Sequence, residues 1–438
     1  MTNNSVTNNG AMTNGAAINV APVSGPTVSS PTRNGSFLIV GGGLAGATAA
    51  ATLREEGFDG RIQIIGSEPH LPYIRPPLSK EYFTGKAERD TIFVHDAAWY
   101  SEHDVDVVSG TAAVSVDVAG HRVALAENRS ILYDRLLIAT GASPRRVTVP
   151  GSSAASIHYL RTVEDSESLR KAISAGGRRI VIVGAGWIGL EIASAARGYG
   201  NDVTVIGRGT IPLQGPLGDD LGSMFQELHE ANGVVFRLPS DIISFTEADG
   251  RVTGVVTDAE TLPADLVVVG VGAIPNVELA EHAGLAVDNG IVVDAALRTS
   301  ADDVFAAGDV ANAFHPVVQQ RMRNEHWANA INSGKIAARS MLGQDVVFDD
   351  IPYFYTDQFD LGMEYSGYPP LTVGAEIVYR GDRAAREFVA FWVNGGRVVA
   401  GMNVNVWDVN DGVQDLIRSQ RQVDLSRLAD QGVPFGEL

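Results

Sequence analysis

The stretch Phe37–Gly46, which reads FLIVGGGLAG, joins an apolar run to a Gly-x-Gly-x-x-Gly turn and decides the fold. The apolar run is typical of a buried strand, and the small residues after Gly46 suit a helix packed closely on a sheet. Glycines in such a turn allow a sharp bend, close approach of a pyrophosphate, and contact between helix and strand. The helix N-terminus adds N–H donors and partial positive charge for phosphates. We therefore predict a dinucleotide site at Gly41, Gly43 and Gly46.

The residues that follow fit the same unit. A second strand is expected over Ile62–Ile65, and it runs into Ser67 and Glu68. An acidic residue about 20 positions after the glycine turn commonly accepts a hydrogen bond from a ribose hydroxyl. Glu68 is the candidate for that role.

The motif occurs twice. Ile180–Gly189 reads IVIVGAGWIG and repeats the apolar run and the glycine spacing at Gly184, Gly186 and Gly189. One such motif is a weak signal, but two at strand-to-helix switches indicate a protein that binds two dinucleotides. The predicted fold is α/β, with two Rossmann-like dinucleotide-binding domains.

Composition excludes several classes of function. Among 438 residues there is no cysteine, which excludes a disulfide, a thiolate zinc site or a cysteine-bound iron–sulfur cluster. The nine His residues have no short metal-ligand spacing, so we expect no metal. A formal charge of −19 opposes nucleic acid or an anionic membrane as a partner. The apolar runs are too short to span a bilayer.

The first 35 residues are rich in Asn, Thr, Ser, Gly and Pro, and they lack the basic start and apolar stretch of a secretory signal. We expect a disordered tail and a cytoplasmic protein. We place the domains at 36–144 with 280–348, at 145–279, and at 349–438.

The segment Pro72–Lys80, PYIRPPLSK, makes a resemblance specific. Its prolines predict a stiff, non-helical segment until Leu78. The sequence resembles the FAD-dependent ferredoxin reductases that serve Rieske oxygenases and cytochromes P450. These are relatives of apoptosis-inducing factor within the pyridine nucleotide-disulfide oxidoreductase superfamily, without its redox disulfide. The resemblance implies that Arg75 and Lys80 contact FAD, with Lys80 near the flavin N5.

Other short segments match the same family in order and spacing. In the resemblance, Asp309 accepts from the ribityl chain, Arg161 reaches the cofactor, and the helix start at Glu325 covers the pyrimidine side of the flavin. Asp309 alone is equally compatible with a helix N-cap. The other implied FAD contacts are Leu44, Ala45, Ser67, Ala113, Ala139, Thr140, Gly141, His326 and Trp327.

The resemblance also implies a pyridine nucleotide site. Glu191 would face the nicotinamide and pair with Lys80, holding that lysine charged by a charge-assisted hydrogen bond. A plain alternative is a first-turn helix carboxylate stabilised by the helix dipole. Tyr355 stands where relatives often carry Trp near the nicotinamide, and it is otherwise an ordinary aromatic residue of a sheet core. The remaining implied contacts are Trp187, Ile188 and Gly272.

The strand Asp202–Ile206 ends in Gly207 and Arg208, where an acid would favour NADH. The missing acid and the adjacent arginine favour NADPH, although Arg208 is also compatible with a solvated loop residue.

From about Ile351 a C-terminal α+β domain is expected, with strands over 353–360, 372–379, 387–393 and 397–404. No histidine follows His326, so this domain is expected to cover the flavin and to offer a docking surface.

The implied activity is hydride transfer from NAD(P)H to FAD, followed by single-electron transfer to a ferredoxin. The missing cysteines exclude disulfide reduction by the usual route. Candidate docking cations are Arg145, Arg146, Arg321 and Arg323. Two alternatives stay open: a redox-responsive interaction protein like apoptosis-inducing factor, and a reductase of small acceptors such as quinones. We expect a monomer or a homodimer.

Overall fold

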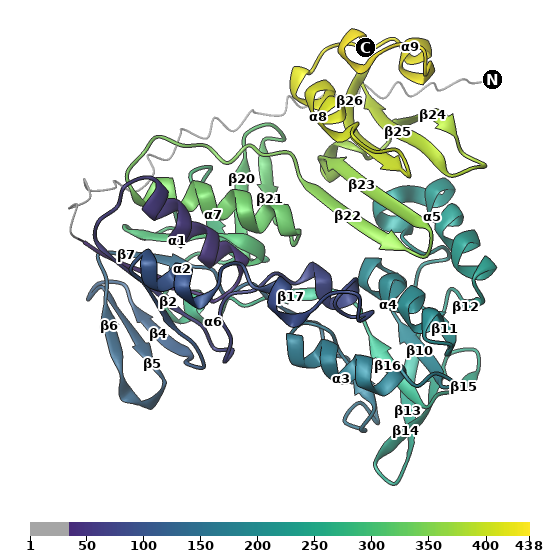
Figure 1. Cartoon of the computed structure of the whole chain (residues 1–438), viewed down its shortest axis with the longest axis horizontal. Helices are drawn as coiled ribbons and strands as arrows, with labels where there is room; N and C mark the ends of the chain where they lie inside the picture. Colours follow the sequence, from purple (N-terminus) through teal and green to yellow (C-terminus); the bar gives the residue numbers. More distant parts are fainter. Residues whose placement is uncertain (1–34) are drawn as a thin grey trace, which may run out of the picture.

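A computed structural model describes residues 35–438. The expected tail, 1–35, lies outside the described residues except for Gly35. Within the described chain, two parallel sheets and one antiparallel sheet organise three domains (Figure 1). This confirms the predicted fold class of two Rossmann-like domains and a C-terminal α+β domain.

The first domain is built on a parallel sheet in the order β19-β7-β1-β2-β3. Helices α1 and α7 pack on each other beside it, and a small antiparallel sheet, β4-β5-β6, adds side chains to the same core. The bounds are β1 Ser36–Val40, α1 Leu44–Glu55, β2 Arg61–Ile65, α2 Ala97–Glu102, β3 Val105–Val108, β4 Ala113–Asp117, β5 Arg122–Leu125, β6 Ser130–Leu132, β7 Arg135–Ile138, α6 Glu278–His282, β18 Ile291–Val293, β19 Val304–Ala306, β20 Ala311–His315, β21 Gln320–Met322 and α7 Trp327–Met341.

The second domain repeats this plan with the parallel order β12-β11-β10-β16-β9. The chain leaves the first domain through β8 (Ala142–Pro144) and returns to it through β17 (Ala273–Pro275), and these two strands pair antiparallel. The bounds are β9 Ile157–His158, α3 Val163–Ile173, β10 Arg179–Val183, α4 Trp187–Gly198, β11 Asp202–Ile206, α5 Gln214–Ala231, β12 Val234–Arg237, β13 Ile242–Ala248, β14 Arg251–Thr257, β15 Thr261–Pro263 and β16 Leu266–Val269.

The C-terminal domain is an antiparallel sheet in the order β22-β23-β26-β25-β24. One face packs on α5 of the second domain through an apolar core that includes Phe225 and Phe388, and the other face packs on α8 and α9 (Figure 1). The bounds are β22 Tyr353–Gln358, β23 Leu361–Gly367, β24 Glu376–Asp382, β25 Glu387–Asn394, β26 Arg397–Val404, α8 Asn410–Ser419 and α9 Leu425–Ala429.

Two local expectations were wrong. Pro76–Ser79 is a 3₁₀ helix, since its two prolines occupy the first helical positions, where no N–H donor is needed. The strand expected over 372–379 begins only at Glu376, because the chain makes a turn in which Ala375 N–H donates to the Thr372 oxygen and Gly374 has a φ of +72°.

Candidate functional site

Two glycine turns fix the starts of α1 and α4 against the ends of their strands. At Gly41 φ is +135°, and a Cβ would lie 2.0 Å from the carbonyl oxygen of Ala139. Gly184 repeats this geometry with φ of +121° and 2.1 Å to the carbonyl oxygen of Gly270. L side chains rarely adopt this backbone conformation, and no side chain fits the space. These two positions accept only glycine.

The other glycines of each turn have different surroundings. A Cβ at Gly46 or Gly189 would lie 2.3 or 2.1 Å from the carbonyl oxygen of the first glycine of its turn. A Cβ at Gly43 or Gly186 would meet no protein atom within 4 Å. The third glycine therefore serves helix–strand packing, whereas the middle one leaves open space where a ligand can approach the backbone.

A cavity of about 870 Å³ opens at the first glycine turn and extends to the start of α4, which follows the second turn, and to β22. Its volume lies within the usual range of cofactor sites. The predicted residues that line it are Gly41, Gly43, Leu44, Ala45, Ser67, Glu68, Arg75, Lys80, Ala113, Ala139, Thr140, Gly141, Arg161, Trp187, Ile188, Glu191, Asp309, Glu325, His326, Trp327 and Tyr355.

Six predicted residues do not line this cavity. Gly46 and Gly189 are packing residues, and Gly184, Gly186 and Gly272 belong to the second domain's own turn and loop. Arg208 lies on the surface with its side chain 84% exposed, and its Nε donates to Asp241 Oδ1 at 2.7 Å. Arg208 is thus an exposed residue outside the cavity that is paired with Asp241.

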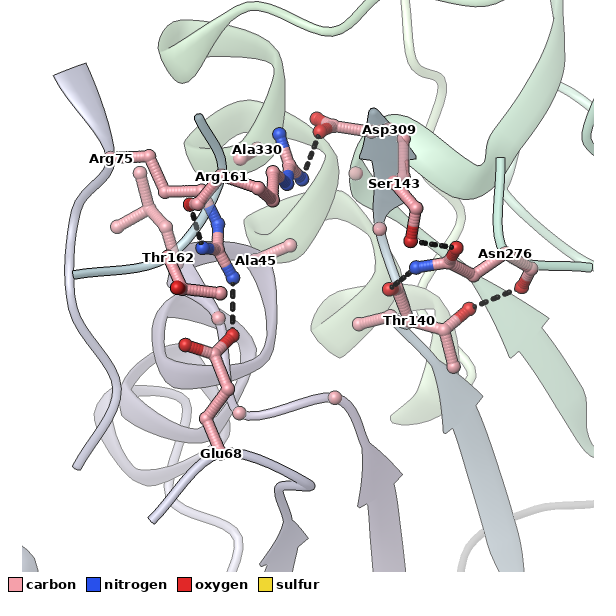
Figure 2. A pocket seen from close by; sticks show the side chains of 18 of the residues that line it. Ala45, Glu68, Arg75, Thr140, Ser143, Arg161, Thr162, Asn276, Asp309 and Ala330 are labelled. Atoms are coloured by element: carbon pink, nitrogen blue, oxygen red, sulfur yellow. Dashed lines mark hydrogen bonds and ion pairs between the residues drawn. The ribbon is translucent and has the colours of Figure 1, made fainter. Parts of the chain in front are cut away.

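Charged side chains in the cavity neutralise one another (Figure 2). Arg75 donates to Glu68 at 2.7 Å, Tyr73 donates to the same carboxylate, and Arg161 donates to Asp309 Oδ2 at 2.8 Å. Arg75 also donates to the backbone oxygen of Arg161, which ties the two ion pairs together. The carboxylates therefore do not oppose an anionic ligand by themselves, and Glu68 keeps lone pairs for a further donor.

Asn276 is a cavity residue whose contacts sequence reasoning missed. Its Nδ2 donates to the backbone oxygen of Thr140 at 2.8 Å, and Thr140 Oγ1 donates to the backbone oxygen of Asn276 at 2.8 Å (Figure 2). Ser143 Oγ donates to Asn276 Oδ1 at 2.7 Å. Asn276 is 136 positions from Thr140 and 133 from Ser143 in the chain, so no local pattern predicts the contacts. The clamp fixes the Thr140 turn against the returning strand.

Lys80 and Glu191 form a buried ion pair between the first and second domains, with side chains 7% and 5% exposed. Glu191 also accepts from Ser79 Oγ at 2.5 Å and from Thr356 Oγ1 at 2.6 Å. Three donors from two segments, Ser79 with Lys80 and Thr356, thus hold one carboxylate, and Lys80 lies 5.4 Å from the ring centre of Tyr355. The buried carboxylate is thus paired with a cation and hydrogen-bonded by two hydroxyl groups, as a buried charge requires.

A series of hydrogen bonds through Gln358 and His229 holds Thr356 in place. Gln358 Nε2 donates to Thr356 Oγ1 at 3.1 Å, so the Thr356 hydroxyl proton is directed at Glu191. Gln358 Oε1 in turn faces His229 Nε2 at 2.8 Å. Burial lowers the pKa of His229 to about 4, so this imidazole is neutral and donates to Gln358. None of these three residues was singled out from the sequence.

His326 gives a test of whether the cavity fits a polar cofactor. Its Nδ1 is buried and has no hydrogen-bond partner within the described chain, and its ring lies 4.5 Å from that of Phe354. Burial lowers the pKa of His326 to about 4. An unpaired buried nitrogen is unfavourable unless a ligand completes it. The start of α1 adds N–H groups beside open space at Gly43, so the residues present fit FAD.

The expected docking patch is not supported at Arg323, whose side chain is 12% exposed and paired with Glu325 at 2.5 Å. Arg321 directs its guanidinium at the backbone oxygens of Val293 and Asn312. Arg145 and Arg146 are exposed.

Two structural absences hold for residues 35–438. No group of three or more His, Cys, Asp or Glu side chains is arranged to hold a metal ion. In the same residues, no helix combines the length and apolarity needed to cross a bilayer.

Comparison with known proteins gives two family matches. Residues 35–334 match the family model described as pyridine nucleotide-disulphide oxidoreductase, and residues 353–438 match the model described as reductase C-terminal.

Individual relatives span nearly the same length. The chain is 38% identical to rhodocoxin reductase of Rhodococcus erythropolis over 84% of this chain and 86% of that protein. It is also 38% identical to the anthranilate 1,2-dioxygenase system ferredoxin–NAD(+) reductase component of Burkholderia cepacia, over 91% and 97%. A solved covalent putidaredoxin reductase–putidaredoxin complex superposes with a TM-score of 0.88 at 33% identity, covering 92% of this chain and 98% of that one.

Proposed function

The chain belongs to the pyridine nucleotide-disulphide oxidoreductase family, and we propose that within it the protein is an FAD-dependent NAD(P)H:ferredoxin reductase. Its named relatives are ferredoxin reductases of oxygenase and cytochrome P450 systems. It is an oxidoreductase that uses FAD and NAD(P)H. FAD accepts the hydride of a reduced nicotinamide and passes electrons on singly.

One observation carries this function: the first glycine turn and the start of the helix after the second turn line a single cavity. Trp187, Ile188 and Glu191 follow the second turn and line the same space as Gly41 and Gly43 of the first. Two nucleotides held at these turns would therefore meet where Lys80 pairs with Glu191. Holding two reactants in a fixed geometry is the main contribution that a protein makes to hydride transfer.

The residues present suggest a division of labour. Gly41, Gly43 and the start of α1 would hold the pyrophosphate of FAD, and Glu68 would accept from a ribose. Lys80, paired with Glu191, would face the reacting end of the flavin and stabilise negative charge there. The C-terminal domain contributes Tyr355 and Thr356 to this end and carries no histidine of its own.

Anaerobic stopped-flow reduction of the purified flavoprotein tests the function. We expect rapid loss of flavin absorbance with at least one of NADH and NADPH, followed by electron transfer to a ferredoxin. Ferricyanide, a quinone and a ferredoxin should be compared under the same nucleotide. A protein that binds no flavin would contradict the proposal, and so would a flavin that both nucleotides reduce only slowly.

A separate prediction concerns Arg208 and the preference between NADH and NADPH. Arg208→Ala should raise the KM for NADPH about tenfold and leave the KM for NADH nearly unchanged, because only NADPH carries a 2′-phosphate for the guanidinium to bind. Steady-state assays with both nucleotides measure this.

Asp241 supplies the matched variant, since its carboxylate pairs with Arg208 and repels a 2′-phosphate. Asp241→Asn should lower the KM for NADPH. Equal effects of Arg208→Ala on both nucleotides would remove Arg208 from the site.

A further inference from the structure

Three buried polar side chains lie in series where the C-terminal domain meets the second domain. His229 belongs to α5, and Thr356 and Gln358 belong to β22; none of the three residues is more than 1% exposed. Phenyl rings lie around them, since His229 makes edge contacts with Phe236 and Phe359. Burying polar groups in apolar surroundings is unfavourable unless each group finds a hydrogen-bond partner. The partners of these three residues therefore decide what the series does.

Local structure brings the three side chains together. Thr356 and Gln358 are two positions apart on a strand, so their side chains point to the same face of the sheet. His229 lies on the buried face of α5. Directly after β22, the backbone N–H of Phe359 donates to Ser194 Oγ of α4 at 2.9 Å. The strand is thus held between α4 and α5, with Thr356 and Gln358 inside.

Glu191 sets the direction of the hydrogen bonds. A carboxylate in an ion pair accepts hydrogen bonds and cannot donate them, so Thr356 Oγ1 is the donor in its 2.6 Å contact with Glu191 Oε1. The Thr356 oxygen then accepts from Gln358 Nε2 at 3.1 Å, which leaves Gln358 Oε1 to accept from His229 Nε2 at 2.8 Å. A reversed amide would draw the hydroxyl proton of Thr356 away from Glu191. The series therefore delivers one donor to the carboxylate in one orientation.

The oxygen that receives this donor is the one that pairs with Lys80. Glu191 Oε1 accepts from both Lys80 Nζ and Thr356 Oγ1, whereas Ser79 donates to the other oxygen, Oε2. The terminal torsion of a glutamate side chain is broad, so a carboxylate without fixed partners on both sides can rotate. Rotation of Glu191 would move the ammonium group that it binds. Thr356 is the partner that the C-terminal domain supplies against this rotation.

We propose that Gln358 and His229 are positioning residues for the hydride transfer of this protein. They act through Thr356, which holds the Glu191 carboxylate and, with it, the ammonium group of Lys80. Neither Gln358 nor His229 lines the cavity of about 870 Å³, so we expect neither to touch a bound nucleotide. The inference rests on the proposed function, in which Lys80 faces the reacting end of the flavin. Small displacements of a reacting group are enough to slow a reaction.

Stopped-flow reduction of the FAD-loaded protein at saturating NAD(P)H tests the proposal. Gln358→Met keeps the length of the side chain but removes the donor to Thr356, and it should lower the limiting rate of flavin reduction about threefold. The Kd for the nucleotide should be unchanged, because the series does not line the cavity. Thr356→Ser keeps the hydroxyl group and should retain the rate. Flavin absorbance reports only the loaded protein, so a variant of lowered stability still yields a rate.

A double variant separates positioning from packing. If Gln358 acts through Thr356, then Gln358→Met combined with Thr356→Val should be no slower than Thr356→Val alone. His229→Phe keeps an aromatic ring against Phe359 and removes the N–H donor. It should slow reduction about twofold, and only while the Thr356 hydroxyl is present. Losses that multiply in the double variants would overturn the proposal, and so would an unchanged rate in Gln358→Met.

Gln63→Met is the matched control. It makes the same substitution at another buried glutamine, 5% exposed on β2, which does not line the cavity. The control should leave the limiting rate unchanged, and an equal loss there would overturn the proposal. Absence of flavin reduction in the unaltered protein would overturn the proposed function and this inference with it. Normal reduction in the unaltered protein and in Gln358→Met alike would overturn only the positioning role.

Discussion

Replacing Lys80 by Met is expected to slow flavin reduction by NAD(P)H about 10²–10³-fold, the usual effect of removing one preorganised charge from a reacting centre. The same change leaves the Glu191 carboxylate, 5% exposed, without its cation. An unpaired buried charge costs about 3–5 kcal/mol of folding free energy. We therefore expect slow reduction and a lowered unfolding midpoint together, measured by stopped-flow absorbance and by thermal unfolding.

A double variant separates the two effects. Lys80→Met combined with Glu191→Gln removes both charges, so stability should largely return while flavin reduction stays slow. Thr356→Val keeps the ion pair and removes one of three donors to Glu191, and it should slow reduction only a few-fold. Lys86→Met, at an exposed position of the same chain segment, is the matched control and should change neither quantity. Recovery of the rate in the double variant would contradict a role for the Lys80 charge.

Gly41→Ala is expected to abolish retention of FAD and to destabilise the protein even without ligand. Its Cβ would lie 2.0 Å from the carbonyl oxygen of Ala139, and φ of +135° is a strained conformation for any L side chain. The clash is with backbone, so no side chain can move to relieve it. Flavin content after purification and apoprotein unfolding measure the two effects.

Gly43→Ala distinguishes a ligand role from a packing role. Its Cβ would meet no protein atom within 4 Å, and the position has an ordinary extended φ of −104°. Apoprotein stability should therefore be nearly unchanged, while FAD affinity falls because the methyl group occupies the approach of the pyrophosphate. Gly186→Ala should leave FAD bound and raise the KM for NAD(P)H instead. Full FAD affinity in Gly43→Ala would exclude that approach.

The sequence was sufficient for those parts of the fold and site that local patterns encode. The apolar runs before Gly41 and Gly184 are strands, and β11 occupies the expected Asp202–Ile206. The predicted pairing of Lys80 with Glu191 is present, although it was inferred from a family resemblance. The roles of the cavity residues toward FAD and NAD(P)H stay predictions.

Contacts that depend on tertiary packing could not be predicted from local sequence patterns. Asn276 and Thr140 meet only because β17 returns beside β8, and Gln358 reaches His229 only because β22 packs between helices. The ion pair of Arg208 depends on Asp241, which lies 33 positions away in the chain. Arg323 failed as a docking residue for the same reason, since its partner Glu325 and its burial are set by the fold.

The paired strands β8 and β17 have a consequence for how this architecture diversifies. Because the second domain departs and returns through adjacent strands, the break points on either side of it lie next to each other in space. The second domain is therefore an insertion whose two ends lie side by side at one point of the first domain. The hydrogen bond from Asn276 to Thr140 holds these two ends together. Exchange of the second domain between related reductases would transfer nucleotide preference as a unit, while the first domain, which would hold FAD, stays unaltered.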